Sequence, residues 1–578
     1  MAESRESIPE STVLFHGGVV RTMAERAEPV SALVLRGGKV AASGTDADMR
    51  RAAGAGAREI NLRGATVMPG IIDTHPHVIH FGIANATHVD ISSAASHDEI
   101  VERICKRAAT TPEGEWILTT PVGEAHYFIR RSWRDLREGK LPDRHILDRA
   151  TVKHPVMLQA WAPSIPNACA LNTPALKQLG FSRETPDRVS NVWIEKDAGG
   201  EPSGILRGSV TNYYTGDAWW DEQLRKLPRP TPEQVLDGLR RAVREYSALG
   251  VTTGYEGHVM DEHLIGAYRA LRDQGALTLR VLTTIEAEHY VWATDPKLTL
   301  DQYKGNCELA QRMTDLSDDL VRVNGLTIES GGPCNPGFLR MRDPFKGPYG
   351  ELTRGRVFVE KEKIEYAIDF CARAGVRLNV ISAGTGEHDE FLDMCEAVAR
   401  THPDIRRRHW ILQHVFFLEE QQARRYAALG FDATASMSFV WGKGDMLTER
   451  VGGHLMKDFM PLRRMLDAGI RVSLGSDWGP KNPFEHLELA MTHRYAGSGH
   501  TNLGPAQRVS REEAVAMFTR EAARLLQWDD IGTLETGSLA DLIVVDRDPL
   551  TCATEELSKT RVLLTMLGGR AVHDADAL

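Results

Sequence analysis

The sequence predicts an α/β protein built on a (β/α)8 TIM barrel. It also predicts a small β-sandwich domain formed by both termini and a long insert after the first barrel strand. Three observations indicate this fold. Eight short apolar runs alternate with helical patterns, both chain ends read as strands with glycine turns, and residues 81–250 separate the first two runs. Eight strands that alternate with helices are typical of a (β/α)8 barrel.

The predicted barrel strands are short, mostly apolar runs. They lie at residues 67–75, 251–257, 277–286, 321–330, 376–384, 409–415, 432–438 and 471–477. Helical patterns fill most of the gaps between them. In 362–375, for example, Ile364, Ala367, Ile368 and Cys371 share one helical face and Gly375 ends the pattern.

The chain ends and the long gap after the first strand define the predicted domains. Residues 1–69 and 531–578 carry β-branched residues beside glycine turns and predict one composite β-sandwich domain. The barrel then spans 70–530. The gap after its first strand is too long for a loop, which predicts an inserted subdomain at about 85–235. The aromatic stretch NYYTGDAWWDE in this insert favours a structural core over a substrate wall.

Composition excludes several classes of protein. The 578 residues are 42% hydrophobic and 26% charged, and the net charge of −10 argues against nucleic acid or an anionic membrane as a partner. Seven cysteines without a CxxC pair favour a reducing compartment. No signal peptide or apolar span is evident, so a cytoplasmic protein with a small-molecule substrate is expected. A homodimer is one expectation for its assembly.

The stretch GIIDTHPHVIH, residues 70–80, raises the first question about chemistry. His75 and His77 follow an apolar run at a predicted strand end. Residues two apart in a strand point to the same side, so both imidazoles can face one ion. The alternative is a histidine-bearing surface turn without chemistry. Neutral imidazoles suit a borderline divalent metal, with Zn favoured and Mn or Fe as alternatives.

Two further strand ends favour the metal site. In WILQHVFF the apolar strand ends in His414, and VSLGSD ends in Asp477 at the eighth strand. Taken alone, His414 is best interpreted as a hydrogen-bonded core histidine and Asp477 as a helix N-cap. In a barrel, however, the carboxyl ends of all strands meet at one face. His75, His77, His414 and Asp477 are therefore predicted to form one metal site.

Four longer motifs point to a known family. The chain contains VMPGIIDTHPH, GEPSGILRG, REAARLLQWDDIGTLETGSLADLIVVDRDPL and LLTMLGGRAVHD. Together with HxH after strand 1, His after strand 6 and Asp after strand 8, they resemble the metal-dependent amidohydrolase superfamily. The resemblance runs nearly end to end and is strongest to the amidohydrolase 3 branch, which includes N-substituted formamide deformylase. It implies a divalent metal and hydrolysis of a carbon–nitrogen bond.

The chain departs from this family on strands 4 and 5. Members of the branch usually carry a metal-bridging lysine on strand 4, where this chain has Thr327. Glu329, two residues further on, could supply a carboxylate ligand instead. Ile381 occupies the place of the usual strand 5 histidine, Asn379 is a poor substitute, and His388 lies further along. A mononuclear site is therefore favoured over a binuclear one.

The predicted activity is hydrolysis of an amide or cyclic amide by metal-activated water. Asp477 would accept the proton of that water and His414 would bind the metal or polarise the substrate carbonyl. One alternative is a non-hydrolytic metal enzyme such as a decarboxylase, hydratase or other lyase, and a less favoured one is a non-catalytic ligand-binding barrel. Other groups near the mouth are interpreted as structural or as weak indications of an apolar substrate: Glu256, His258, Glu286, Glu288, His126, Trp161, Trp441 and Trp478.

Overall fold

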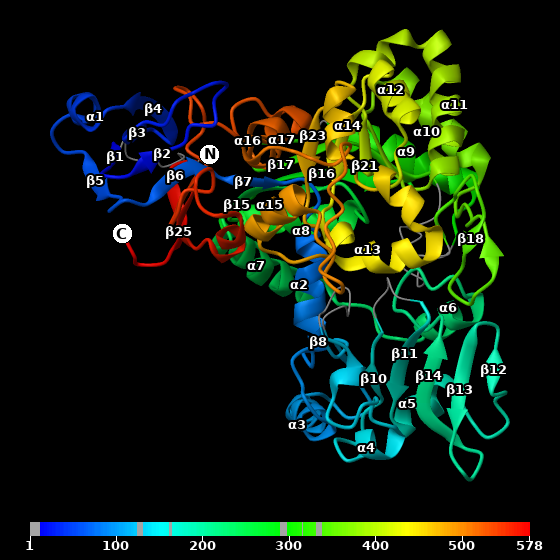
Figure 1. Ribbon diagram of the computed structural model, residues 1–578. Helices are drawn as coiled ribbons and strands as arrows, with labels where there is room; N and C mark the ends of the chain where they lie inside the picture. The colour runs from blue at the N-terminus through cyan, green and yellow to red at the C-terminus, as the bar shows by residue number, and fades with distance from the viewer. Residues whose placement is uncertain (1–11, 124–130, 161–164, 289–296, 315, 331–337) are drawn as a thin grey trace, which may run out of the picture.

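The computed structural model describes residues 12–123, 131–160, 165–288, 297–314, 316–330 and 338–578. Figure 1 shows three parts. A barrel with its helices occupies the centre, strands from both chain ends lie together at one side, and a second sheet extends from the barrel at the bottom of the view.

All eight predicted barrel strands are present in one parallel sheet. Its order is β7 (Ile71–Asp73), β15 (Val251–Glu256), β16 (Arg280–Glu286), β17 (Val321–Glu329), β20 (Leu378–Ser382), β21 (Ile411–His414), β22 (Asp432–Ala435) and β23 (Val472–Leu474). Helices connect successive strands, as the alternating pattern predicted. The TIM-barrel fold class is confirmed.

The two edge strands of this sheet meet and bring the chain's first and last barrel segments together. The Thr74 backbone N–H donates to the Leu474 carbonyl at 3.2 Å, and the Thr74 and Ser473 hydroxyl oxygens lie 2.8 Å apart. Because β7 and β23 are neighbours around the barrel, residues that follow them share one rim. This places the HxH segment beside the segment that contains Asp477.

The predicted helices form for local reasons that the structure makes visible. Helix α7 (Pro232–Ala248) begins at a capping box in which Thr231 and Gln234 satisfy each other's backbone N–H groups. Helix α10 (Lys361–Ala374) ends at Gly375, whose φ of +76° lies in the left-handed region that glycine adopts without steric cost. Both helices bury one apolar face against the barrel.

Strands from both termini form two small sheets, as predicted. The first contains β4 (Lys39–Gly44), β3 (Ala32–Arg36), β1 (Val13–His16) and β5 (Arg58–Asn61), and the second contains β2 (Val19–Val20), β6 (Thr66–Pro69), β24 (Leu542–Val545), β25 (Val562–Leu567) and β26 (Arg570–Asp574). Side chains of the two sheets share one core, in which Phe15 and Leu33 pack with Val544 and Leu564. The exact domain limits stay a prediction.

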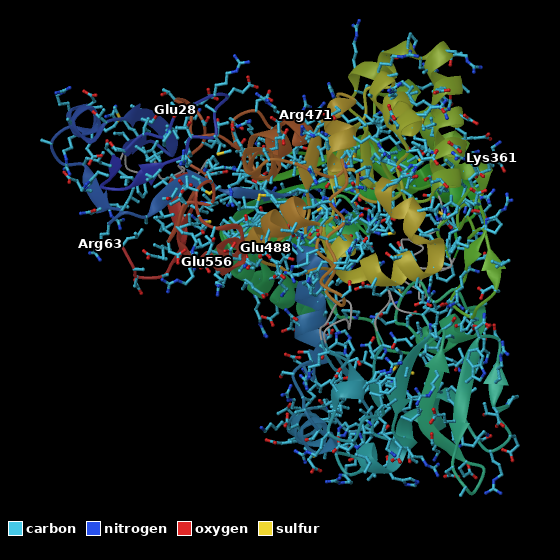
Figure 2. All side chains as sticks on the ribbon, in the orientation of Figure 1. Glu28, Arg63, Lys361, Arg471, Glu488 and Glu556 are labelled. Atoms are coloured by element: carbon cyan, nitrogen blue, oxygen red, sulfur yellow. The ribbon has the colours of Figure 1, made fainter. Side chains whose placement is uncertain are left out.

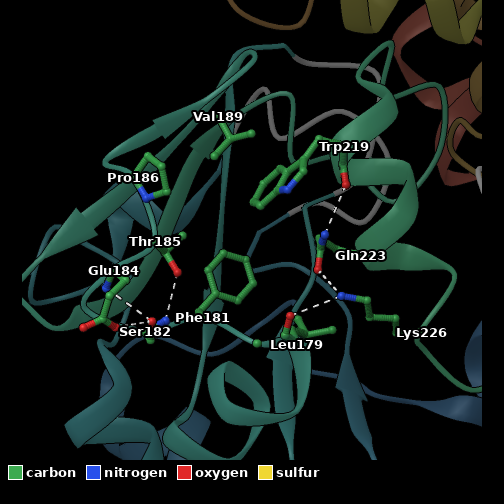
Figure 3. Close-up of a pocket in the computed structure, with 11 residues that line it drawn as sticks. Leu179, Phe181, Ser182, Glu184, Thr185, Pro186, Val189, Trp219, Gln223 and Lys226 are labelled. Carbon is green, nitrogen blue, oxygen red and sulfur yellow. Dashed lines mark hydrogen bonds between the residues drawn. The ribbon is translucent and has the colours of Figure 1, made fainter.

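The insert between helices α2 (Val78–Thr87) and α7 carries its own sheet. Seven strands run from β8 (His88–Val89) to β14 (Pro202–Gly208). This part contains a hollow of about 420 Å³. Figure 3 shows residues that line it, among them Phe181, Trp219 and Lys226. Trp220 is fully buried in the insert core, in agreement with the structural interpretation of its aromatic stretch.

Charged side chains cover the outside of the molecule. Figure 2 shows Glu28, Arg63 and Lys361 pointing outward at well-separated places on the surface. Among the described residues, no helix is long and apolar enough to cross a membrane.

A buried ion pair joins the barrel to the C-terminal strands. Arg280 donates two hydrogen bonds to the Asp541 carboxylate, at 2.6 and 3.1 Å, and both side chains are almost fully buried. Breaking a buried pair leaves one charge uncompensated, so Arg280→Met should lower the free energy of unfolding by about 3–5 kcal/mol. Denaturant titration measures this change.

The exposed pair Arg149–Asp98, with N–O distance 2.8 Å, offers the control. Arg149→Met should cost about 0–1 kcal/mol because solvent screens exposed pairs. Equal losses in the two variants would contradict a structural role for the buried pair.

Candidate metal centre

The four residues predicted as the metal site come together at the carboxyl ends of the barrel strands. The Nε2 atoms of His75 and His77 lie 3.1 Å apart. Carboxylate oxygens of Asp477 lie 3.9 Å from His75 Nε2, 3.5 Å from His77 Nε2 and 3.8 Å from His414 Nε2. All four side chains are buried. The surface-turn alternative for the HxH stretch is therefore wrong.

The backbone at this rim has an uncommon conformation. His77, His414 and Asp477 have φ values of +51°, +70° and +53°. Non-glycine residues in this left-handed region cost about 1–3 kcal/mol each in strained settings, and they gather at functional sites. The Asp477 backbone N–H also donates to the His75 carbonyl at 2.6 Å, which couples the first and eighth strand ends directly.

The donor atoms fit a divalent ion. A tetrahedral ion with bonds of about 2.0–2.1 Å holds its ligand atoms about 3.3–3.4 Å apart, close to the separations found here. Asp477 Oδ2 and His75 Nδ1 are buried, and neither has a hydrogen-bond partner among the described residues. A buried carboxylate oxygen that faces imidazole nitrogens is satisfied when all of them bind one cation.

The electrostatics favour the protonation states that metal ligands need. Burial lowers the pKa of His75 well below its usual range and that of His414 to about 3, so both imidazoles are neutral. Burial alone would raise the pKa of Asp477, but His75, His77 and His414 together hold it well below its usual range. Neutral imidazoles and an ionised carboxylate are the forms that coordinate metals.

Asp73 holds the two rim segments in place. Its Oδ1 accepts the backbone N–H groups of His75 and Ser476, both at 3.0 Å, and its Oδ2 accepts the Ser476 hydroxyl at 2.6 Å. One buried carboxylate thus orients the residues on either side of the barrel closure. Sequence reasoning did not assign Asp73 a role, although it precedes the HxH pair directly.

His80 orients His77 through a chain of hydrogen bonds. His80 Nε2 lies 3.1 Å from the Val259 carbonyl, which can only accept, so this nitrogen carries the proton. In the neutral ring His80 Nδ1 must then accept from His77 Nδ1, 3.2 Å away. The tautomer of His77 that results leaves its Nε2 lone pair facing His75 and Asp477.

Removing this support should weaken metal binding. We expect His80→Ala to lower the metal affinity by about 10- to 100-fold, the usual effect of losing a group that orients a histidine ligand. Competition with a chelator measures the affinity. His154→Ala is the matched control, because His154 is buried in the insert, where its Nε2 lies 3.0 Å from the Thr111 carbonyl. Equal affinities in the two variants would contradict the role of His80.

The departures on strands 4 and 5 are visible in the structure. Thr327 and Asn379 bind each other inside the barrel, since the Asn379 amide donates to Thr327 Oγ1 at 2.8 Å and Thr327 donates to the Gly257 carbonyl at 2.7 Å. Ile381 is the register partner of Glu329 and is buried. Where strand 4 offers a carboxylate, strand 5 thus offers an aliphatic side chain.

Glu329 lies in a neighbouring group rather than with His75, His414 and Asp477. Its partners are His258 and Glu286, and the potential ligand atoms of these three residues lie within 4.8 Å of one another. The sequence alone favours a structural role for His258 and Glu286. One signal could have found His258: it lies two residues beyond the end of β15, as His75 lies two residues beyond the end of β7.

Aromatic side chains line the other side of the cluster. Trp478 stacks on the His77 ring with centroids 4.8 Å apart, and Tyr213 stacks on Trp478 at 5.9 Å. The stretch NYYTGDAWWDE therefore divides its roles, because Trp220 packs in the insert core while Tyr213 and Tyr214 reach the barrel. His126 and Trp161, which the sequence places near the mouth of the barrel, lie outside the described residues.

A barrel with several imidazoles and a carboxylate at its rim is typical of metal-dependent hydrolases. The amidohydrolase family model matches residues 58–573, and the chain belongs to this family. It is an enzyme that acts on non-peptide carbon–nitrogen bonds, as its family membership shows.

Individual relatives match over nearly the whole chain. N-substituted formamide deformylase from Arthrobacter pascens is 28% identical over 95% of this chain and 96% of its own. The putative amidohydrolase YtcJ from Bacillus subtilis (strain 168) is 24% identical over 97% and 99%. Among solved structures, an uncharacterized metal-dependent hydrolase from Pyrococcus horikoshii OT3 has a TM-score of 0.70 at 20% identity, covering 94% of this chain and 99% of its own.

Proposed function

We propose that this enzyme hydrolyses an amide or cyclic amide bond in a small molecule, with His75, His77, His414 and Asp477 holding one divalent ion. The observation that carries the proposal is the convergence of three imidazoles on the Asp477 carboxylate, whose Oδ2 is buried without a hydrogen-bond partner among the described residues. Three nitrogen ligands and one oxygen favour Zn, with Mn or Fe as alternatives.

Asp477 is the proposed proton shuttle. A bound divalent ion would lower the pKa of a water molecule from about 15.7 towards 7. Asp477, held ionised by the surrounding imidazoles, is placed to accept a proton from the attacking water and to return it to the leaving nitrogen. His414 ends β21 on the same rim and would bind the ion or polarise the scissile carbonyl.

The proposed substrate carries an apolar or aromatic group on its amide nitrogen. Trp478 and Tyr213 present stacked rings next to His77, and such surfaces pack against aromatic groups. The similarity to N-substituted formamide deformylase supports N-substituted formamides as the first compounds to test.

The proposal is tested by the fate of solvent oxygen. Metal-loaded enzyme is incubated with N-benzylformamide and related amides in water enriched in ¹⁸O, and the products are analysed by mass spectrometry. Hydrolysis places one solvent oxygen in the released carboxylic acid and liberates the amine.

Formation of product without incorporation of solvent oxygen would overturn the hydrolytic mechanism and favour a lyase. Turnover that survives complete removal of metal would also overturn it. The variant Asp301→Asn, at a fully exposed carboxylate, controls for effects of substitution alone.

A further inference from the structure

A second buried group of potential ligands lies beside the first. His258 follows β15, Glu286 ends β16 and Glu329 ends β17, so the three residues come from consecutive barrel strands. The His258 ring centroid lies 5.9 Å from that of His75 and 5.7 Å from that of His77. Both groups therefore face the same mouth of the barrel, and each is almost fully buried.

Hydrogen bonds hold this second group in a defined arrangement. Glu286 Oε2 lies 3.1 Å from His258 Nδ1 and also accepts the Val259 backbone N–H. Tyr214, from the insert, donates its hydroxyl to Glu329 Oε1. The same Glu329 oxygen lies 4.0 Å from His258 Nε2. One oxygen of each carboxylate is thus positioned by a donor.

The other oxygen of Glu329 has no such donor. Glu329 is only 2% exposed, and its buried Oε2 lacks a hydrogen-bond partner among the described residues. The buried cation Lys363 is engaged by Glu288 at 2.6 Å. Two buried carboxylates beside an imidazole are stabilised by a shared cation.

We propose that His258, Glu286 and Glu329 form a second divalent-cation site, separate from the site of His75, His77, His414 and Asp477. One imidazole nitrogen and two carboxylates suit Zn²⁺, Mn²⁺ or Fe²⁺. Ca²⁺ and Mg²⁺ fit this ligand set less well, because they prefer oxygen ligands only. This site goes beyond the proposed function, which requires only the one ion held by His75, His77, His414 and Asp477. An ion at this site and an ion at the site of Asp477 would both lie at the same mouth of the barrel.

Metal stoichiometry tests the proposal. The full chain is stripped with a chelator, reloaded with Zn²⁺ or, separately, Mn²⁺, passed over a desalting column and analysed for metal per chain. We expect about two ions in the wild-type protein and about one in Glu329→Gln, because loss of a ligand carboxylate removes the charge that holds the second ion. The double variant His75→Ala/His77→Ala should also keep about one ion, at the second site.

Glu387→Gln is the matched control. Glu387 is a buried glutamate on the same side of the barrel, whose carboxylate accepts the Ser330 hydroxyl at 2.9 Å, and its variant should keep both ions. Circular dichroism verifies that each variant is folded, and Glu286→Gln provides a second test if Glu329→Gln is not.

The outcomes separate this inference from the proposed function. A wild-type protein with one ion, lost in His75→Ala/His77→Ala and kept in Glu329→Gln, overturns the second site and leaves the first. Two ions that persist in both Glu329→Gln and Glu286→Gln also overturn it. A wild-type protein that binds neither Zn²⁺ nor Mn²⁺ overturns both proposals.

Discussion

The double variant His75→Ala/His77→Ala is expected to lose its hydrolytic activity almost completely. The two imidazole nitrogens lie 3.1 Å apart and face the Asp477 carboxylate, so their removal deletes half of the proposed ligand set. Metal ions supply several kcal/mol of transition-state stabilisation, and about 1.4 kcal/mol corresponds to a tenfold rate change. We therefore expect kcat/KM to fall by at least about 10³-fold.

Steady-state kinetics on the amide found in the labelled-water experiment measures this loss, together with metal content. His263→Ala is the control, because His263 is exposed on helix α8 (Glu262–Asp273) and is not among the predicted site residues. Full activity in the double variant at saturating metal would contradict the assignment of His75 and His77. A loss of activity in His263→Ala would show that the loss in the double variant does not report on the metal site.

Replacement of Asp477 by asparagine is expected to lower kcat by about 10²- to 10⁴-fold, the usual contribution of general acid–base catalysis. Asparagine nearly matches the size of the carboxylate but cannot accept the proton of the attacking water. The backbone bond from Asp477 to the His75 carbonyl does not involve the side chain, so the rim should keep its shape. His75, His77 and His414 remain available as ligands.

The decisive comparison is kcat against metal content. If Asp477 moves the proton, Asp477→Asn falls in kcat even at metal concentrations that restore full loading. If Asp477 serves only as a ligand, excess metal restores kcat and the proton-shuttle role is wrong. Asp301→Asn, at a surface carboxylate with a 96% exposed side chain, should retain wild-type kinetics.

Much of the barrel could be predicted because its determinants are local. Each strand is a short apolar run bounded by turns, and β20 (Leu378–Ser382) is recognisable from its own residues. Helix ends are similarly local, as Gly375 shows. The proposed ligands His75 and His414 could also be predicted, because a polar residue at the carboxyl end of a buried strand faces the rim of such a barrel.

The second group was not predictable in the same way. His258 and Glu286 become neighbours through the alignment of β15 with β16, which a single sequence does not specify. The contact between Tyr214 and Glu329 joins residues 115 positions apart, one of them from the insert. Taken singly, neither His258 nor Glu286 has a sequence pattern that indicates a metal ligand.

The family, the order of strands and helices, and the residue types at the rim of the barrel could all be predicted from the sequence. These features depend on hydrophobic periodicity, turn residues and motifs that lie within a few positions of one another. The three-dimensional structure was needed to show that Glu329 joins His258 and Glu286, and that Tyr214 from the insert reaches this group. Barrel register and the path of the insert fix these contacts, and both result from packing between segments that are distant in the chain.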